Sequence, residues 1–295
     1  MAYLATRADR LIFCLCVAGC APFSKALDDT AHAGSAGEAS ASTAGSASTA
    51  GSANETGTEG GSAGTENASA GAAAADARHH SLFNGVDLAS WDRYLGKPSD
   101  GEPVLGLDND PRAVYSVVML DGEPAIRISG EVWGSLISKQ EFCNFRLHAE
   151  FKWGSTVWTI KDSGIMFLSR GPLGAVNAGG NALSDPIGSG GFMVSTEYQI
   201  SPNDVGTLYN LGPIAFTGTL HSVRPERAAA WNQVEISFED DFASTSLNGQ
   251  EVSRASGFSL HWPGQPEAAL RCGKLQLQSE GAEIFFRRVE LDELP

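Results

Sequence analysis

Three side chains in the sequence have the chemistry of proton transfer and stand where a site can form. Glu197 precedes Gln199 by two residues in an alternating segment, so both side chains are expected on one polar face. Asp162 directly precedes a Ser-Gly pair, where a loop carboxylate can point into a cleft. His221 lies in a segment rich in glycine and proline, between two predicted strands. Carboxylates and imidazoles are the usual general acids and bases of enzymes.

These candidates also have structural interpretations that the sequence leaves open. Glu197 can be a solvated strand carboxylate, or the ion-pair partner of Lys152. Asp162 can serve only to form a turn before the next strand. A lone histidine such as His221 can equally be a surface or structural residue.

Strands are the elements that must position these side chains. Residues 143–153, 192–200 and 231–238 alternate between apolar and polar side chains, which predicts half-buried strands. An Asn-Gly pair at 248–249 predicts a two-residue hairpin of type I′, and a Glu-Gly pair at 280–281 predicts another turn. No long helical stripe is present, so the domain is predicted to be all-β, with two antiparallel sheets packed as a sandwich or jelly roll. Further predicted strands are 113–120, 124–129, 164–169, 273–279 and 282–291.

The composition divides the chain into a folded part and an unfolded part. Residues 26–77 contain no aromatic residue, no Ile, Val or Met, and no Lys or Arg. Such a segment cannot bury enough apolar surface to offset the entropy of ordering, so it is predicted to be disordered. Residues 80–295 carry 16 basic against 27 acidic residues, a net charge of −11. That charge argues against nucleic acid as a partner, because phosphate binding needs a basic surface.

The N-terminus has the features of an exported, lipid-anchored protein. Arg7 and Arg10 precede a short apolar run, which ends in Val-Ala-Gly before Cys20 and resembles a bacterial lipobox. The resemblance implies a signal peptide of residues 1–19, lipidation of Cys20, a tether of residues 20–79 and a jelly-roll domain of residues 80–295. Ala21 favours the outer membrane of the bacterial cell envelope. The alternative is an ordinary secretory signal that is cut elsewhere.

Two cysteines fall within the predicted domain. Cys143 and Cys272 have no spacing typical of a zinc site. They lie in strand-like segments, and we expect buried free thiols. A disulfide between them is the alternative.

From residue 81 onward the chain resembles the bacterial 3-keto-disaccharide hydrolase family, whose fold is a concanavalin A-like jelly roll. The chain departs from the family in the loop after Gln199, which is short and has Asn203-Asp204 in place of an acidic-Asn step. The stretches that carry the resemblance occur in the family's order, at residues 82–91, 133–152, 162–165, 197–200, 208–209, 231–236, 247–249, 275–281 and 286–289.

The resemblance implies cleavage of glycosides whose sugar is already oxidised to a ketone at carbon 3. A base removes the hydrogen on carbon 2, the enolate expels the group on carbon 1, and water adds back. On this resemblance Glu197 is the expected base or metal ligand, with Asp162 and His221 as further catalytic candidates. A divalent cation can stabilise the enolate, although its ligands are not identified. The substrate-binding candidates are Lys152, Arg170, Gln199, Tyr209, Trp133 and Gln278, of which the aromatic residues can instead be core residues.

The resemblance also implies a partner reaction, since a sugar 3-oxidoreductase must make the ketone. Two other functions stay open: a non-catalytic carbohydrate-binding jelly roll, and an ordinary glycosidase acting on unoxidised sugars. The segment Glu290-Leu-Asp-Glu293 lacks the full sequence spacing of the paired carboxylates of jelly-roll glycosidases, so it does not support the two-carboxylate hydrolysis scheme.

Overall fold

The computed structural model describes residues 78–177, 190–222 and 225–295. The predicted signal peptide, Cys20 and the tether before Arg78 lie outside the described residues. Every regular element in these ranges is a strand, and the first begins at His79, one residue before the predicted start of the domain. The described residues contain no helix with the length and apolarity needed to cross a membrane.

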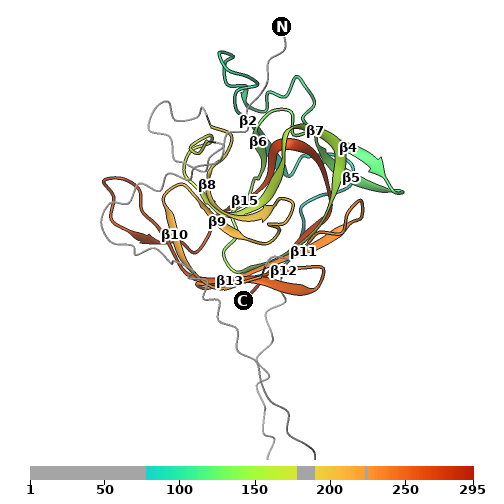
Figure 1. Ribbon diagram of the computed structural model, residues 1–295. Coiled ribbons are helices and arrows are strands. Elements are labelled where there is room, and N and C mark those ends of the chain that lie inside the picture. The colour runs from blue at the N-terminus through green and yellow to red at the C-terminus, as the bar shows by residue number, and fades with distance from the viewer. Residues whose placement is uncertain (1–77, 178–189, 223–224) are drawn as a thin grey trace, which may run out of the picture. The chain divides into compact units, whose positions relative to one another are not determined.

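Fifteen strands make up the described part of the domain (Figure 1). They are β1 (His79–Ser81), β2 (Trp91–Leu95), β3 (Gly106–Leu107), β4 (Tyr115–Leu120), β5 (Glu123–Ile128), β6 (Gly134–Ser138), β7 (Phe145–Arg170), β8 (Val194–Ile200), β9 (Leu208–Leu211), β10 (Ile214–His221), β11 (Asn232–Glu239), β12 (Phe242–Leu247), β13 (Gln250–Leu260), β14 (Ala268–Ala269) and β15 (Lys274–Glu293).

The strands form two antiparallel layers that share their two longest members. Layer A has the order β10-β13-β12-β11-β7-β15, and layer B has the order β9-β8-β7-β15-β6-β2-β3. The first part of β7 pairs with β11 and its last part pairs with β8. Strand β15 likewise pairs with β6 near its start and with β1 near its end. Both strands curve from one layer into the other (Figure 1), and the predicted all-β jelly-roll sandwich is confirmed.

Apolar residues at every second position of the strands fill the space between the layers. Phe145 of β7 and Phe238 of β11 are buried in layer A, as the alternation predicts. Phe167, in the layer B part of β7, packs against Phe145 with ring centroids 6.4 Å apart. Phe258 of β13 packs against both Phe167 and Phe238. The polar side chains of the same strands therefore point away from the core, on the outer face of each layer.

The turn predictions are confirmed at residues 248–249 and wrong at residues 280–281. Asn248 and Gly249 both have positive φ, as a type I′ turn between β12 and β13 requires. Gly281 also has positive φ, but β15 runs through it without a turn. Glu280 and Gly281 both oppose Asp162, so the Glu-Gly pair forms a β-bulge. A Cβ atom on residue 281 would lie 2.4 Å from Thr159 Oγ1, which is why only glycine fits there.

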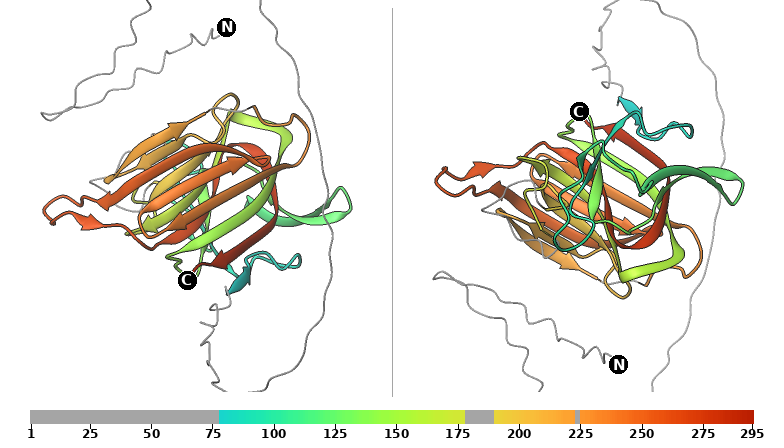
Figure 2. Two further views of the ribbon diagram at one scale, coloured as in Figure 1. Left: turned by 90° about the horizontal axis from the view of Figure 1, so that it is seen from below. Right: turned by 90° about the horizontal axis from the view of Figure 1, so that it is seen from above.

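The β4–β5 hairpin projects from the sandwich (Figures 1 and 2). Asp121 and Gly122 form its two-residue turn, and both have positive φ. Asp121 accepts hydrogen bonds from Lys152 Nζ and Trp231 Nε1, each at 2.8 Å. These bonds hold the turn against the outer face of layer A.

The two cysteines of the domain are bonded to each other. Cys143 and Cys272 form a disulfide with Cα atoms 4.0 Å apart, so the prediction of buried free thiols is wrong. Cys143 is moreover exposed. The pair lies just before β7 and β15, where Phe142 and Gly273 exchange two backbone hydrogen bonds. The cysteines are 129 residues apart in the sequence, so the pairing depends on which strands become neighbours.

Candidate functional site

The candidate site lies on the outer face of layer B. On β8, Tyr198 and Ile200 point into the core, so Glu197 and Gln199 point away from it. Glu197 lies opposite Met166 of β7 on one side and opposite Tyr209 of β9 on the other. We call this surface the Glu197 face.

Glu197 and Gln278 converge above a glycine. Gly164 lies on β7 between the two strands that carry them, and both side chains are almost completely buried. A Cβ atom on residue 164 would lie 2.5 Å from Glu197 Oε1 and 3.1 Å from Gln278 Oε1. The glycine therefore leaves the space in which the two side chains meet. Within the described residues neither of these oxygen atoms has a hydrogen-bond partner.

The surroundings of Glu197 disfavour its charged form. The residue is 4% exposed, and burial, together with the nearby charges of Asp162 and Asp204, raises the pKa of Glu197 to about 8. The nearby amide of Gln278 acts in the opposite direction and lowers this pKa. The raised value follows mainly from burial in a low-dielectric environment.

Asp162 is a second buried carboxylate on this face. It is four residues before Met166 on β7, so the two side chains share a face. The backbone N–H of Ser163 donates a hydrogen bond of 3.0 Å to its Oδ1. Buried Glu280 opposes Asp162 across the β-bulge of β15. Three neighbouring strands thus each place a buried acidic residue in this area, namely Asp162, Glu197 and Glu280.

A chain of polar contacts joins Tyr209 to His221. The Tyr209 hydroxyl donates to Asp204 Oδ2 at 2.8 Å, and the Thr207 hydroxyl donates to Asp204 Oδ1. Thr207 Oγ1 lies 3.5 Å from His221 Nε2. Burial and the hydrogen bond to Asp204, with the charges of Glu197 and Asp162, raise the pKa of Tyr209 to about 12. Tyr209 is 42% exposed, so part of its ring beside Glu197 is accessible to a ligand.

The structure brings together most of the residues that the sequence selects. Glu197, Gln199 and Gln278 share the Glu197 face with Asp162 and Tyr209. His221 joins this group only through Thr207 and Asp204, and it ends strand β10 rather than lying in a loop as predicted. The remaining selected residues are Lys152, Arg170 and Trp133.

Lys152 and Arg170 are not brought to Glu197. Lys152 lies on the outer face of layer A, where its ammonium group pairs with Asp121 at 2.8 Å. Arg170 ends β7, donates to the carbonyl of Cys272 at 2.8 Å and pairs with Glu141. Trp133 is half-buried and packs against the core. The ion pairs of Lys152 and Arg170 hold these two side chains away from Glu197, so the geometry does not support their predicted substrate-binding role. The substrate-binding role of Trp133 stays a prediction.

Three residues of the site escaped the sequence analysis or were only noted in it. Asp204 was noted as part of the short loop, although not as a partner of Tyr209. No motif in the sequence points to Thr207 as a functional residue. Glu280 stands two residues after Gln278, and this spacing places both on one face of a strand. A turn at residues 280–281, as predicted, would end the strand before Glu280, so the shared face of Gln278 and Glu280 was not predicted.

The predicted divalent cation has no complete cage of ligands in this region. Among the described residues, no three His, Cys, Asp or Glu side chains are grouped so that they could hold a metal ion. The donor set among the described residues therefore does not fit a resident metal held by such side chains alone.

Comparison with known proteins gives one family match. Residues 78–292 match the model of a family described as the 3-keto-alpha-glucoside-1,2-lyase-like domain. No curated protein is significantly similar to the sequence.

Several solved structures resemble the chain at low identity. A protein of Parabacteroides distasonis described as a candidate glycosyl hydrolase is 17% identical, with a TM-score of 0.47 over 74% of this chain and 94% of that chain. A β-glucanase of Bacillus licheniformis is 12% identical, with a TM-score of 0.35 over 75% and 98% of the two chains. The carbohydrate-binding module CBM66 of Bacillus subtilis is 11% identical, with a TM-score of 0.34 over 61% and 92%. Similarity at this level identifies neither a reaction nor a substrate.

Proposed function

We propose that this chain, which belongs to the family of 3-keto-alpha-glucoside-1,2-lyase-like domains, cleaves glycosides oxidised to a ketone at carbon 3. The family makes carbohydrate the class of molecule on which the domain acts. The finer proposal concerns the reaction and rests on the chemistry of the Glu197 face.

The reaction needs a base that removes the hydrogen on carbon 2. The ketone makes this hydrogen acidic enough for a carboxylate to remove it. A carbonyl at carbon 3 acidifies the hydrogen on carbon 2, because the electrons left behind are delocalised onto the carbonyl oxygen. The carboxylate takes this proton, the enolate forms, and the glycosidic oxygen leaves carbon 1 with a proton from an acid or from water. Addition of water to the resulting double bond completes a net hydrolysis.

Glu197 carries the proposal, because its pKa of about 8 lies close to neutral pH. A general base is most effective when its pKa lies near the working pH, since it is then partly ionised and also basic enough. In our proposal Glu197 takes the proton from carbon 2, and the charge of Asp162 keeps Glu197 basic. Tyr209 stands next to Glu197 with part of its ring exposed and packs against the sugar. Asp204, Thr207 and His221 supply a route by which a proton reaches the leaving oxygen.

The surroundings in which this reaction takes place are also a proposal, supported by sequence features alone. Cys20 carries the lipid that holds the chain in the bacterial cell envelope, with the outer membrane favoured. A sugar 3-oxidoreductase supplies the ketone. A divalent cation that uses substrate or water oxygen atoms as further ligands is compatible with this scheme.

The proposal is tested by incubating the purified protein with an aryl 3-keto-glucoside and with the unoxidised parent. Release of the aryl group is followed with added Mg²⁺, Mn²⁺ or Ca²⁺ and with EDTA. We expect release from the keto substrate alone, and its loss in Glu197→Gln. The matched control is Glu239→Gln, which changes an exposed glutamate on layer A.

The other outcomes identify the alternatives. Release from both substrates would indicate an ordinary glycosidase. No release under any metal condition, together with measurable saccharide binding, would indicate a non-catalytic carbohydrate-binding domain. Either result would reject the proposed reaction.

A further inference from the structure

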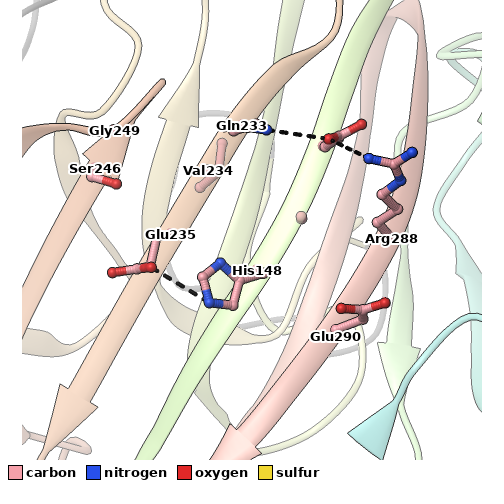
Figure 3. A pocket seen from close by; sticks show the side chains of 10 residues that line it. His148, Gln233, Val234, Glu235, Ser246, Gly249, Arg288 and Glu290 are labelled. Atoms are coloured by element: carbon pink, nitrogen blue, oxygen red, sulfur yellow. Dashed lines mark hydrogen bonds and ion pairs between the residues drawn. The ribbon is translucent and has the colours of Figure 1, made fainter.

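The outer face of layer A carries a recess (Figure 3). Since the Glu197 face is the outer face of layer B, the core of the sandwich separates the two. Its volume is about 320 Å³, which is at the lower end for small-molecule sites. Strands β7, β11 and β15 form its floor, and residues at the β12–β13 turn form one side. We call it the outer recess, and its polar side chains come from His148, Glu150, Gln233, Glu235, Arg288 and Glu290.

One row of side chains crosses the recess from strand to strand. Glu235 of β11 and Glu290 of β15 both lie directly opposite His148 of β7. His148 Nε2 is 3.4 Å from Glu235 Oε2. Figure 3 shows the imidazole between the two carboxylates. All three side chains remain accessible to solvent, so they can contact a ligand.

A second row is held more rigidly. Glu150 of β7 lies opposite Gln233 of β11, whose amide nitrogen is 3.5 Å from Glu150 Oε1. Arg287 Nε donates to Glu150 Oε2 at 2.6 Å, and Arg288 Nη1 donates to Glu150 Oε1 at 3.2 Å. The Glu150 side chain is only 9% exposed, so this carboxylate is a fixed part of the wall.

A β-bulge turns Arg288 toward the recess. Neighbouring residues of a regular strand point to opposite faces, yet Arg287 and Arg288 both pair with Glu123 and Glu150. The register of β15 against β7 shifts by one residue between Arg287 and Glu290. Arg288 has a φ of 50°, which is uncommon for a residue other than glycine. Bulges of this kind re-aim a side chain, and here the result is a guanidinium group in the recess wall.

The donors and acceptors of the recess alternate, and this pattern selects the ligand. Carboxylates accept, while the Gln233 amide and the Arg288 guanidinium donate. Hydroxyl groups both donate and accept, so a pyranose with adjacent hydroxyls can bond to such neighbours together. An anionic ligand would meet the carboxylates of Glu235 and Glu290, and a cationic one would meet Arg288. The net charge of −11 over residues 80–295 further disfavours an anion.

We propose that the outer recess is a second, non-catalytic binding site for neutral saccharide. The choice of carbohydrate rests in part on the proposed function, whereas the site itself rests on the recess and its two rows. Such a site would hold the domain on a glycan while the Glu197 face acts on an oxidised sugar unit.

The test titrates the full-length protein calorimetrically with two probes, maltotetraose and laminaritetraose. The first variant is the double substitution Glu235→Ala and Glu290→Ala, which removes both carboxylates of the accessible row. We expect binding of at least one probe to weaken by about tenfold or more, because each lost hydrogen bond to a charged group weakens binding by about that factor. Turnover of the aryl 3-keto-glucoside should stay unchanged, which also shows that the variant is folded.

Two further variants make the result unambiguous. Ser246→Trp fills the recess from its side without breaking an ion pair, and it should also weaken saccharide binding. Glu239→Ala removes a matched exposed glutamate from the same strand as Glu235, outside the recess, and should change nothing.

The proposal is overturned if the wild type binds neither probe, or if the recess variants bind both probes as tightly as the wild type. Absence of any turnover on the keto substrate, with saccharide binding still lost in the recess variants, would reject the proposed reaction and leave the recess proposal standing. The two proposals can therefore fail separately.

Discussion

Two glutamates on the outer faces of the two layers are buried to a similar degree but have opposite surroundings. Glu150 of layer A bonds to two guanidinium groups, those of Arg287 and Arg288. Glu197 of layer B forms no ion pair with a Lys or Arg within the described residues. The charges that act on its pKa are the negative charges of Asp162 and Asp204, and both raise it. Burial alone therefore does not make a reactive carboxyl group. A buried carboxylate becomes basic only when the surroundings leave its charge uncompensated.

The difference also separates structural from chemical roles. The ion pairs of Glu150 fix the strands of layer A and shape the wall of the outer recess. On the Glu197 face, the surroundings of Glu197 disfavour its charged form. Strongly shifted pKa values of this kind are typical of functional sites. The following predictions test this contrast, beginning with the largest effect.

The largest contrast is expected in catalysis. Glu197→Gln should lower kcat on a 3-keto-glucoside by about 10²–10⁴-fold, since an amide cannot take the proton from carbon 2. Glu150→Gln should leave kcat close to that of the wild type, because Glu150 lies on the other layer. Steady-state kinetics of both variants measure the effect, and equal losses in the two would contradict the contrast.

The next contrast concerns the dependence of stability on pH. The folded state raises the pKa of Glu197 to about 8 from an unfolded value near 4.5, so the folded state holds a proton that the unfolded state releases. Between these two pH values the contribution of Glu197 to stability falls as pH rises, by about 5 kcal/mol in total. Urea unfolding at several pH values should show a smaller fall in Glu197→Gln. Parallel curves for wild type and variant would show that Glu197 is not perturbed.

Urea unfolding should also show that the charged carboxylate of Glu150, unlike that of Glu197, stabilises the folded protein. Glu150→Ala removes the shorter of the two ion pairs of the buried Arg287 guanidinium and leaves only its pair with Glu123, so we expect a loss of about 2 kcal/mol in the free energy of unfolding at neutral pH. Glu235→Ala is the control, because its ion pair with His148 is half exposed and should contribute less than about 1 kcal/mol. A loss at Glu150 no greater than that of the control would remove the distinction between the two glutamates.

The smallest effect is a shift of the pH–rate profile. Glu197 acts as a base only when it is ionised, so the rate should rise with pH and level off above about pH 8. Asp162→Asn removes a negative charge that raises the pKa of Glu197, so the midpoint should move to lower pH by about one unit. The profile of kcat/KM against pH measures this shift. A midpoint that stays in place would show that burial alone sets the pKa.

Strand periodicity predicts the fold and part of the site, because it depends on neighbours in the sequence. The alternation along residues 192–200 places Glu197 and Gln199 on one face, and the structure agrees. Pairing between distant strands is not encoded in this local pattern. The disulfide of Cys143 with Cys272 and the bond of Lys152 to Asp121 both depend on such pairing. The bulge at Gly281 was missed because a glycine with positive φ serves equally well in a turn.

The sharing of β7 and β15 by both layers has a consequence for how the domain unfolds. Each layer loses the paired strands β7 and β15 if the other comes apart, so neither can melt alone. We therefore expect a single cooperative transition for the two faces together. The pairing of His79 with Asp292 joins residues nearly the whole length of the domain apart. Such distant contacts can form only after most of the chain has been synthesised, and they make folding slow.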